Sequence, residues 1–457
     1  GKNGCSSTCH ASRKCFINSS LPLTRSGVIS RLLPMIALHF RFLKFDKIRR
    51  RVPLQKVLVI NKFIPAPAFG GGTKRSLAWL RFLSKHYEVT LVGHWDKEFG
   101  DQRIAELRDY TKEIFGFPHT RTVKSLFITA LHALSSNQSV TLLQYHQREM
   151  QEKIDELCAK ETFAFILCEE LSSMQYVRNI RGTPVFLDDQ NIEYELADRA
   201  IKNATFFLRP VFRYEASRIR SFEQASWKQV EKTFFVSERD RAICAAAVPE
   251  APCAVLENTF SENGIAILPP AQWSESPTIA FVGNISWGPN RNGLNRFLTK
   301  VYPLVKQTLP ETEFFLMGSC ATKEIRKLCE KNQIHLLENV EEEKKSEILS
   351  RCWVTVAPVY YGGGTRVKIL EYWAHAKATV STVIGNEGLA PSAGTWSGDE
   401  DREMAQTLIS LLQDRQIAAQ MGRQNHEVFK RFYEETAVYG DSLYRSITAQ
   451  LHEQESL

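Results

Sequence analysis

The stretch YYGGGTRVKILEYW, residues 360–373, joins three successive glycines to the charged residues Arg366, Lys368 and Glu371. Glycine accepts positive φ and lets backbone amides approach a ligand closely. Where such a loop leads from a strand into a helix, unpaired amides and the helix dipole favour an anion such as phosphate. Arg366 and Lys368 could neutralise a diphosphate, Thr365 could cap the helix, and Glu371 could reach a ribose diol. The alternative interpretation is a glycine turn with solvent-exposed charges.

Two series of alternating strands and helices surround this stretch. The first series has a helix with Leu77, Leu80 and Leu83 on one side and a helix after the N-cap Ser237. Its strands are expected at 56–63, 88–95, within 163–170 and 183–191, and before Ser237. The second series has strands at 278–284, 312–319, 334–340, 353–359 and 378–382, with helices at 292–308, 324–332, 343–352 and 364–376. Such alternation is typical of α/β folds with doubly wound parallel sheets, whose ligands bind beyond the carboxyl ends of the strands.

The chain is long enough for two domains. We expect five segments: a basic extension 1–51, a first Rossmann-like domain 52–262, a linker 263–277, a second Rossmann-like domain 278–430 and a helical tail 431–457. The two adjacent prolines 269 and 270, in a segment without long periodicity, indicate the linker.

The net charge of +7 comes from the first 51 residues, which hold eleven Lys and Arg against the single acid Asp46. The rest of the chain is slightly acidic, which argues against a nucleic-acid partner. The basic, Ser-containing head has the composition of an organelle transit peptide, and the alternative is a disordered extension. We therefore expect a cytoplasmic or organellar protein that is not secreted.

The ten cysteines include no CxxC pair. Cys5, Cys9 and His10 offer too few ligands for a closed zinc site, so no metal site is expected. Apolar neighbours of Cys168 and Cys352 indicate buried thiols of a reducing compartment.

The segment APVYYGGGTRVKILEYWAHAKATVSTVIGNEGL, residues 357–389, resembles the donor site of family 4 glycosyltransferases (glycosyl transferases group 1), in the subgroup with a GGGTR loop. Three further segments resemble the same family in order: INKFIPAPAFGGGTKRSLAWLRFLSKHYEVTLVG, DQNIEYELADR and FVGNISWGPNRNGLNRFLTKVYP. The resemblance covers about residues 55–430 and implies the GT-B fold, in which two Rossmann-like domains face a central cleft.

By its position, Glu371 matches the second glutamate of the family's E-x7-E motif. The resemblance implies that this glutamate binds the ribose. Gly363 stands where many members have the first glutamate. The family's Arg and Lys after the FVG strand would fall near Asn284 and Pro289, so both cations are missing there. The diphosphate must then be met by Arg366, Lys368, Arg291 or loop amides.

In the first domain, the loop 70–75 corresponds to the family's glycine loop near the leaving diphosphate. Glu169 falls where retaining members often have a sugar-contacting His, and Gln190 replaces another His. A carboxylate at Glu169 could orient the acceptor hydroxyl or support positive charge at the anomeric carbon; the alternative is a solvated strand end, as for Asp188 and Asp189. We expect catalytic roles for Glu169, Arg366 and Lys368, and donor binding by Gly71, Gly72, Gly283, Asn284, Gly362, Gly363, Gly364, Thr365, Arg366, Glu371 and Asn386.

The resemblance implies a retaining, metal-independent transfer of a hexose from a nucleoside-diphosphate sugar to an acceptor hydroxyl on a glycan, a lipid-linked sugar or a protein-linked sugar, with no cofactor. The alternatives are a nucleotide-sugar 2-epimerase on the same fold and a non-catalytic nucleotide-sugar-binding subunit. A helix carrying Lys74, Arg75, Arg81 and Lys85 beside leucines is compatible with peripheral membrane contact, or with an ordinary helix.

Overall fold

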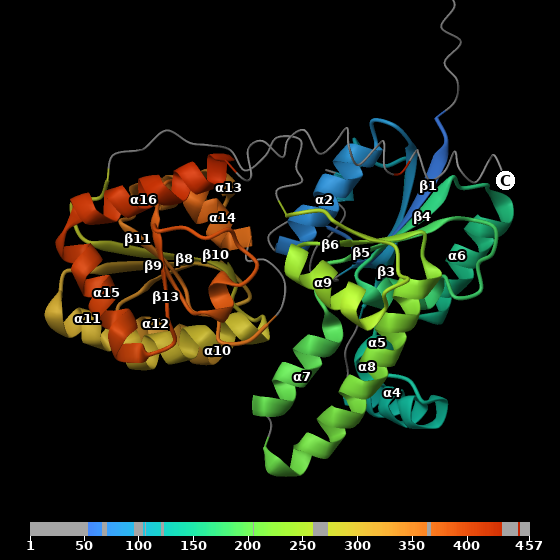
Figure 1. The fold of residues 1–457 in the computed structure, drawn as a ribbon, viewed down its shortest axis with the longest axis horizontal. Helices are drawn as coiled ribbons and strands as arrows, with labels where there is room; N and C mark the ends of the chain where they lie inside the picture. Colours follow the sequence, from blue (N-terminus) through green and yellow to red (C-terminus); the bar gives the residue numbers. More distant parts are fainter. Residues whose placement is uncertain are drawn as a thin grey trace, which may run out of the picture. The chain divides into compact units, whose positions relative to one another are not determined.

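The computed structural model of the chain describes residues 54–65, 71–95, 104–105, 107–119, 123–203, 205–258, 273–362, 367–431 and 447. Residues 54–457 form one compact unit that holds two separate parallel β-sheets. Helices cover both faces of each sheet (Figure 1).

The first sheet belongs to the first domain and contains seven strands among the described residues, in the order β3-β2-β1-β4-β5-β6-β7. All of its pairs are parallel. The strands are β1 (Lys56–Phe63), β2 (Glu88–Trp95), β3 (Glu113–Pro118), β4 (Phe165–Glu169), β5 (Val185–Asp189), β6 (Lys232–Phe235) and β7 (Cys253–Val255). The strand order reverses between β1 and β4, where doubly wound sheets place their ligands.

The second sheet repeats this design with six strands among the described residues, in the order β10-β9-β8-β11-β12-β13. Its pairs are also parallel, and its order reverses between β8 and β11. The strands are β8 (Thr278–Asn284), β9 (Glu313–Ser319), β10 (His335–Glu338), β11 (Val354–Ala357), β12 (Ala378–Ser381) and β13 (Thr395–Ser397). The predicted pair of doubly wound parallel sheets is thus confirmed.

Strand β1 shows why these runs are apolar throughout rather than alternating. Val57 and Val59 pack into one core cluster of the first domain, while Leu58 and Ile60 pack into the other. Successive side chains of a strand point to opposite faces, so a strand covered on both sides must be apolar at every position.

The helices of the first domain connect its strands. They are α2 (Gly71–Leu83), α4 (Val123–Ser136), α5 (Val140–Leu143), α6 (Arg148–Lys160), η1 (Leu171–Tyr176), α7 (Glu193–Asn203), η2 (Phe206–Leu208), α8 (Arg209–Gln229) and α9 (Glu238–Ala247). Ser237 caps α9 as predicted, because its side chain accepts the Asp240 N–H. The expected loop at 70–75 is wrong in part, since α2 already begins at Gly71.

In the second domain, the helix expected at 292–308 is longer and irregular. It comprises α10 (Gly288–Arg296), a π-helical turn η3 (Phe297–Val301) and α11 (Tyr302–Thr308). Pro303 has no N–H to continue the α-helical ladder, and the Tyr302 N–H bonds to the Phe297 carbonyl instead. The remaining helices are α12 (Lys323–Lys331), α13 (Glu342–Arg351), α14 (Val367–Ala374), η4 (Ile384–Asn386), α15 (Asp401–Gln413) and α16 (Arg415–Phe429).

The predicted domain limits fall partly on residues outside the described ranges, namely 1–53, 259–272 and most of 432–457. The last strand of the first sheet ends at Val255, and the first strand of the second sheet begins at Thr278. Ile447, from the predicted tail, is buried in the core cluster of the first domain that also contains Val57 and Trp79.

Candidate active site

The predicted donor loop follows β11, at the carboxyl edge of the second sheet. Gly363, Gly364, Thr365 and Arg366 lie outside the described residues, so their roles remain predictions. Gly362 is described and buried, and its carbonyl accepts a hydrogen bond from the Arg199 guanidinium of α7.

Glu371 is a buried carboxylate on α14 surrounded by lysines. Its Oε1 lies 2.6 Å from Nζ of Lys345 on α13 and 3.5 Å from Nζ of Lys74 on α2. Burial alone would raise the pKa of Glu371, but Lys74 and Lys345 lower it below the usual value. Glu371 is therefore ionised at neutral pH and can accept hydrogen bonds from two neighbouring hydroxyls.

Lys345 is likewise kept charged by neighbours of opposite charge. Burial would lower the pKa of Lys345, but Glu371 and Glu342 raise it above the usual value. A cavity of about 30 Å³ lies beside these lysines and is lined by Gly283 and Gly318 among others. It has room for about one water molecule, so a nucleoside bound here must displace the Lys74 and Lys345 side chains.

Lys368 supplies a cation at the end of β8. Its Nζ donates to Asn290 Oδ1 at 2.7 Å and lies 4.1 Å from the centre of the Phe281 ring. A Cβ at Gly283 would lie only 2.9 Å from this Nζ, which is the movable end of the lysine, and the φ of +157° at Gly283 also favours glycine. The cation that the sequence lacks near Asn284 and Pro289 thus comes from the neighbouring helix α14.

Asn284 and Asn386 differ in what their side chains do. Asn284 Oδ1 accepts the N–H groups of Ser286 and Trp287 at 3.0 and 3.1 Å, which shapes the turn into α10. Asn386 Oδ1 is buried without a hydrogen-bond partner among the described residues. Of the two side-chain oxygens, Asn386 Oδ1 is therefore better placed than Asn284 Oδ1 to accept a hydrogen bond from a ligand hydroxyl.

At the carboxyl edge of the first sheet, Glu169 ends β4 and is in register with Asn61 of β1. The Ser76 hydroxyl of α2 donates to Glu169 Oε2. Glu169 Oε1 and both amide atoms of Asn61 are buried with no partner in the described part of the chain. Burial, and after it the Asp188 charge, raise the pKa of Glu169 well above its usual value. Both of its expected roles remain predictions.

Arg75 does not lie on a membrane-facing surface, contrary to one interpretation of its helix. It is 3% exposed, its Nε and Nη2 bond to both oxygens of Asp188, and its Nη1 donates to the Leu256 carbonyl at 2.7 Å. Asp188 is likewise buried rather than a solvated strand end. The pair fixes the start of α2 on the ends of β5 and β7.

Gly71 and Gly72 begin α2 and are closely approached by side chains of other elements. A Cβ at Gly71 would lie 3.1 Å from Val367, and one at Gly72 would lie 2.8 Å from Gln190 Oε1. Gln190 also lies beside Asp188, with its Nε2 3.4 Å from Oδ2. Asp189 is buried too, and its Oδ2 accepts the Trp227 indole N–H at 2.8 Å.

Two arginines of the first domain were missed in the sequence. Arg199 Nη1 lies 3.0 Å from Glu387 Oε2, and Arg239 Nε lies 3.1 Å from Glu387 Oε1. Glu195 also contacts both arginines. Arg199 belongs to the DQNIEYELADR segment and Glu387 to VIGNEGL, but nothing in either segment indicates that they pair.

His94, at the end of β2, was also missed. Its Nε2 lies 2.7 Å from the Tyr145 carbonyl oxygen, which can only accept, so Nε2 carries the proton. Nδ1 is buried without a partner among the described residues. Asn61 directly follows the apolar run VLVI and His94 follows LVG, each near the carboxyl end of its strand, and this position is a signal that could have identified them.

We expect His94 to make stability depend on pH. Burial lowers the pKa of His94 from 6.5 to about 4. The unfolded chain binds this proton below pH 6.5 and the folded chain only near pH 4, so stability falls as the pH drops through this window. The loss at pH 5 is about 2 kcal/mol. In urea titrations at pH 7 and pH 5, His94→Gln should lose less stability between the two pH values than the wild type. An unchanged pH dependence in this variant would contradict the assignment.

The comparisons with known proteins agree with this geometry. Residues 276–414 match the family described as glycosyl transferases group 1. The matched segment lies in the second domain and spans less than half of the chain. It contains Gly283, Lys368, Glu371 and Asn386, so these candidate donor contacts all lie within it.

The whole chain resembles several known proteins. It is 21% identical over 358 residues to an uncharacterized 44.6 kDa protein in the cps region of Klebsiella pneumoniae, covering 75% of this chain and 86% of that protein. The structure of TarM from S. aureus matches with a TM-score of 0.57 and 10% identity, over 88% of this chain and 99% of TarM. Anabaena Alr3699/HepE, solved with UDP and glucose, matches with a TM-score of 0.56 and 12% identity, over 88% of this chain and 99% of that one. The fold of the chain is therefore GT-B, like that of these solved structures.

Other sequence expectations concern cysteines, metals and membranes. Cys168 and Cys352 are buried free thiols, as predicted. Within the described ranges, no group of three His, Cys, Asp or Glu residues could hold a metal ion. No helix within these ranges is long and apolar enough to cross a bilayer. Cys5, Cys9 and His10 lie outside the described residues.

Proposed function

We propose that this chain is a retaining glycosyltransferase that moves a hexose from a nucleoside-diphosphate sugar to an acceptor hydroxyl, without a metal. One observation carries the proposal: an ionised, buried Glu371 and the cation of Lys368 lie on one helix after the reversal point of the second sheet. A carboxylate for a diol and a cation for a diphosphate are the two groups that a nucleoside diphosphate requires.

Donor binding follows from these positions. Glu371 would accept both ribose hydroxyls in place of its contacts with Lys345 and Lys74. Lys368, together with Arg366 and the loop amides, would balance the diphosphate charge as the bond between the anomeric carbon and the diphosphate oxygen breaks. Because these cations come from the protein, the proposal gives the leaving group its stabilisation without a metal. Asn386 Oδ1 would accept from a sugar hydroxyl.

The acceptor would bind at the carboxyl edge of the first sheet. Asn61, His94 and Glu169 end the adjacent strands β1, β2 and β4, and each has a buried polar atom without a partner in the described ranges. Unsatisfied buried polar groups are costly unless a ligand completes them. A glycan hydroxyl, on a free or lipid-linked sugar, offers both a donor and an acceptor to such groups.

The direct test is release of nucleoside diphosphate from UDP- and GDP-sugars, with and without candidate acceptors. Lys368→Met should weaken binding of the nucleotide sugar about tenfold, because one charge-assisted contact to the diphosphate is lost, and Lys368→Arg should retain most of it. Calorimetric titration measures both variants. Equal affinity of Lys368→Met and wild type would contradict the diphosphate role.

The same assay separates the alternatives. A nucleotide-sugar 2-epimerase releases nucleotide and an epimerised sugar without any acceptor. A binding subunit shows calorimetric affinity but no release with any donor or acceptor. A transferase requires both substrates, and the anomeric configuration of its product, read by NMR, tests retention.

A further inference from the structure

The α7–α8 hairpin of the first domain exposes an apolar tip. Phe206 and Phe207 are 75% and 85% exposed, and Leu208 and Val211 are 50% and 63% exposed. Figure 1 shows α7 and α8 projecting together away from the first sheet. Soluble surfaces rarely keep several large apolar side chains together in water unless they bind something.

The charges around the tip are almost all positive. Residues 205–222 contain Arg209, Arg213, Arg218 and Arg220, and the single acid is Glu215. Glu215 is directed to the start of α5, where it accepts from the Ser139 hydroxyl and from the N–H groups of Val140 and Thr141. On α7, Asp198 pairs with Arg220 at 2.5 Å, so this arginine is already matched by a carboxylate. The tip therefore combines exposed aromatic rings with guanidinium groups and retains an excess of positive charge.

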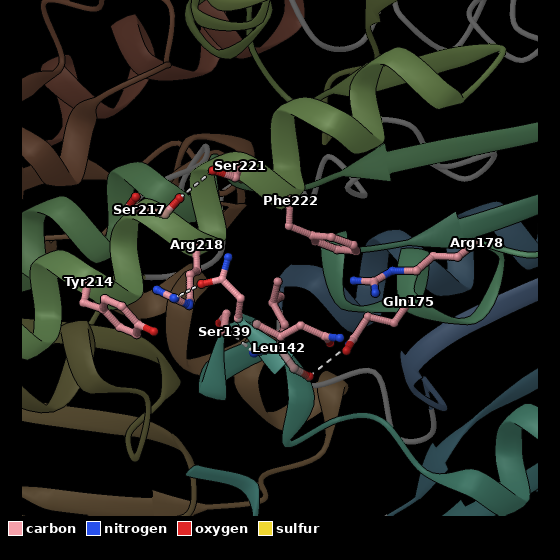
Figure 2. Close-up of a pocket in the computed structure, with 11 residues that line it drawn as sticks. Ser139, Leu142, Gln175, Arg178, Tyr214, Ser217, Arg218, Ser221 and Phe222 are labelled. Atoms are coloured by element: carbon pink, nitrogen blue, oxygen red, sulfur yellow. Dashed lines mark hydrogen bonds between the residues drawn. The ribbon is translucent and has the colours of Figure 1, made fainter. Parts of the chain in front are cut away.

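A pocket of about 480 Å³ lies further along α8, between that helix and the segment where α4 meets α5 (Figure 2). Arg218 and Arg178 both line it, and Figure 2 shows their guanidinium groups on opposite sides of the pocket. Arg218 donates to Asn137 Oδ1, while its Nε is buried with no partner in the described part of the chain. Arg178 lies 4.6 Å from the centre of the Phe222 ring. Such a pocket suits a phosphate group.

Helix α4 adds further apolar surface beside the pocket. Ile128 and Leu131 are 55% and 53% exposed, and α4 ends next to Asn137, which Arg218 contacts. Exposed apolar surface thus lies on both helices that border the pocket.

We propose that this surface, formed by η2, the first turns of α8 and helix α4, docks onto an anionic lipid bilayer. The aromatic tip enters the interface, and the pocket between Arg178 and Arg218 takes a lipid phosphate. Apolar insertion combined with arginine attraction to anionic lipids is the physical basis of interfacial membrane binding. The proposal goes beyond glycosyl transfer and does not depend on it.

A second copy of the chain fits this surface less well. A two-fold contact would place the same patch against itself, so the excess positive charge of the two copies would be brought together. A bilayer surface with negatively charged phosphates would attract this positive charge instead of repelling it. Helix α2 is not the membrane element, because its Leu80, Leu83 and Arg75 are buried.

The test is co-sedimentation of the full chain with vesicles of phosphatidylcholine alone or with about one third phosphatidylglycerol. We expect binding to the anionic vesicles, weakened by salt. Phe206→Ser/Phe207→Ser should lower the partition coefficient about tenfold or more. The matched control Leu304→Ser/Ile417→Ser changes two similarly apolar exposed residues of the second domain, 36% and 47% exposed, and should bind like the wild type.

Four results would overturn the proposal. The first is absence of wild-type binding to anionic vesicles, and the second is equal binding by the tip variant and the wild type. The third is a wild-type dimer in light scattering that the tip variant dissociates. Free glycerol phosphate should not release the protein from vesicles, because it cannot replace the inserted rings; complete release would also contradict insertion.

Discussion

Glu371→Gln should lower the rate of nucleotide-sugar turnover about 100-fold or more. Gln keeps the shape of the side chain but replaces a charged acceptor for two hydroxyls with a neutral amide, and charge-assisted hydrogen bonds contribute about 1.5–3 kcal/mol each. The change also leaves Lys345 and Lys74 without the carboxylate that they contact at 2.6 and 3.5 Å. Release of nucleoside diphosphate under saturating acceptor measures the effect.

A matched control separates this role from a structural one. Lys345→Gln removes the partner but retains the carboxylate, so it should reduce turnover far less than Glu371→Gln. Both variants should be compared with the wild type by thermal unfolding. Wild-type turnover in a folded Glu371→Gln protein would contradict the assignment of Glu371 to the donor site.

The largest expected loss of stability is that of Arg75→Met. Removing one partner of a buried ion pair costs about 3–5 kcal/mol because the other charge is left uncompensated. Asp188 is fully buried, so Arg75→Met leaves such a charge next to Glu169. Urea titration should show this loss in the free energy of unfolding.

Two comparisons make the result specific. The double variant Arg75→Met/Asp188→Leu removes both charges and should recover most of the stability. Lys153→Met breaks a partly exposed pair with Glu156 at 3.1 Å and should cost at most about 1 kcal/mol. If Arg75→Met is no more destabilising than Lys153→Met, the buried pair does not hold α2 in place.

Much of the fold could be predicted because its signals are local. The apolar run at β8 has the predicted bounds, and Ser237 caps α9, because a strand buried on both faces and a helix N-cap each leave a mark on a few adjacent residues. Strand β3 was missed, since its sequence EIFGFP contains Gly116 and Pro118 and its residues are only partly buried.

The candidate site was predicted only where a motif marks it. Glu371 and Lys368 follow the glycine loop, and both lie where a donor could meet them. The burial of Arg75 depends on Asp188, which is 113 residues away, and the contacts of Arg199 depend on Gly362 and Glu387. Contacts between residues so far apart in the sequence are determined by strand order and packing, and no short sequence pattern predicts them.

Ile447 has a consequence for how the chain is made. It completes a core cluster whose other members lie between Val57 and Leu256. During synthesis those residues leave the ribosome first. The core around the first sheet therefore lacks the Ile447 side chain until nearly two hundred further residues have been added. The first domain can complete this core cluster only when Ile447 has emerged from the ribosome.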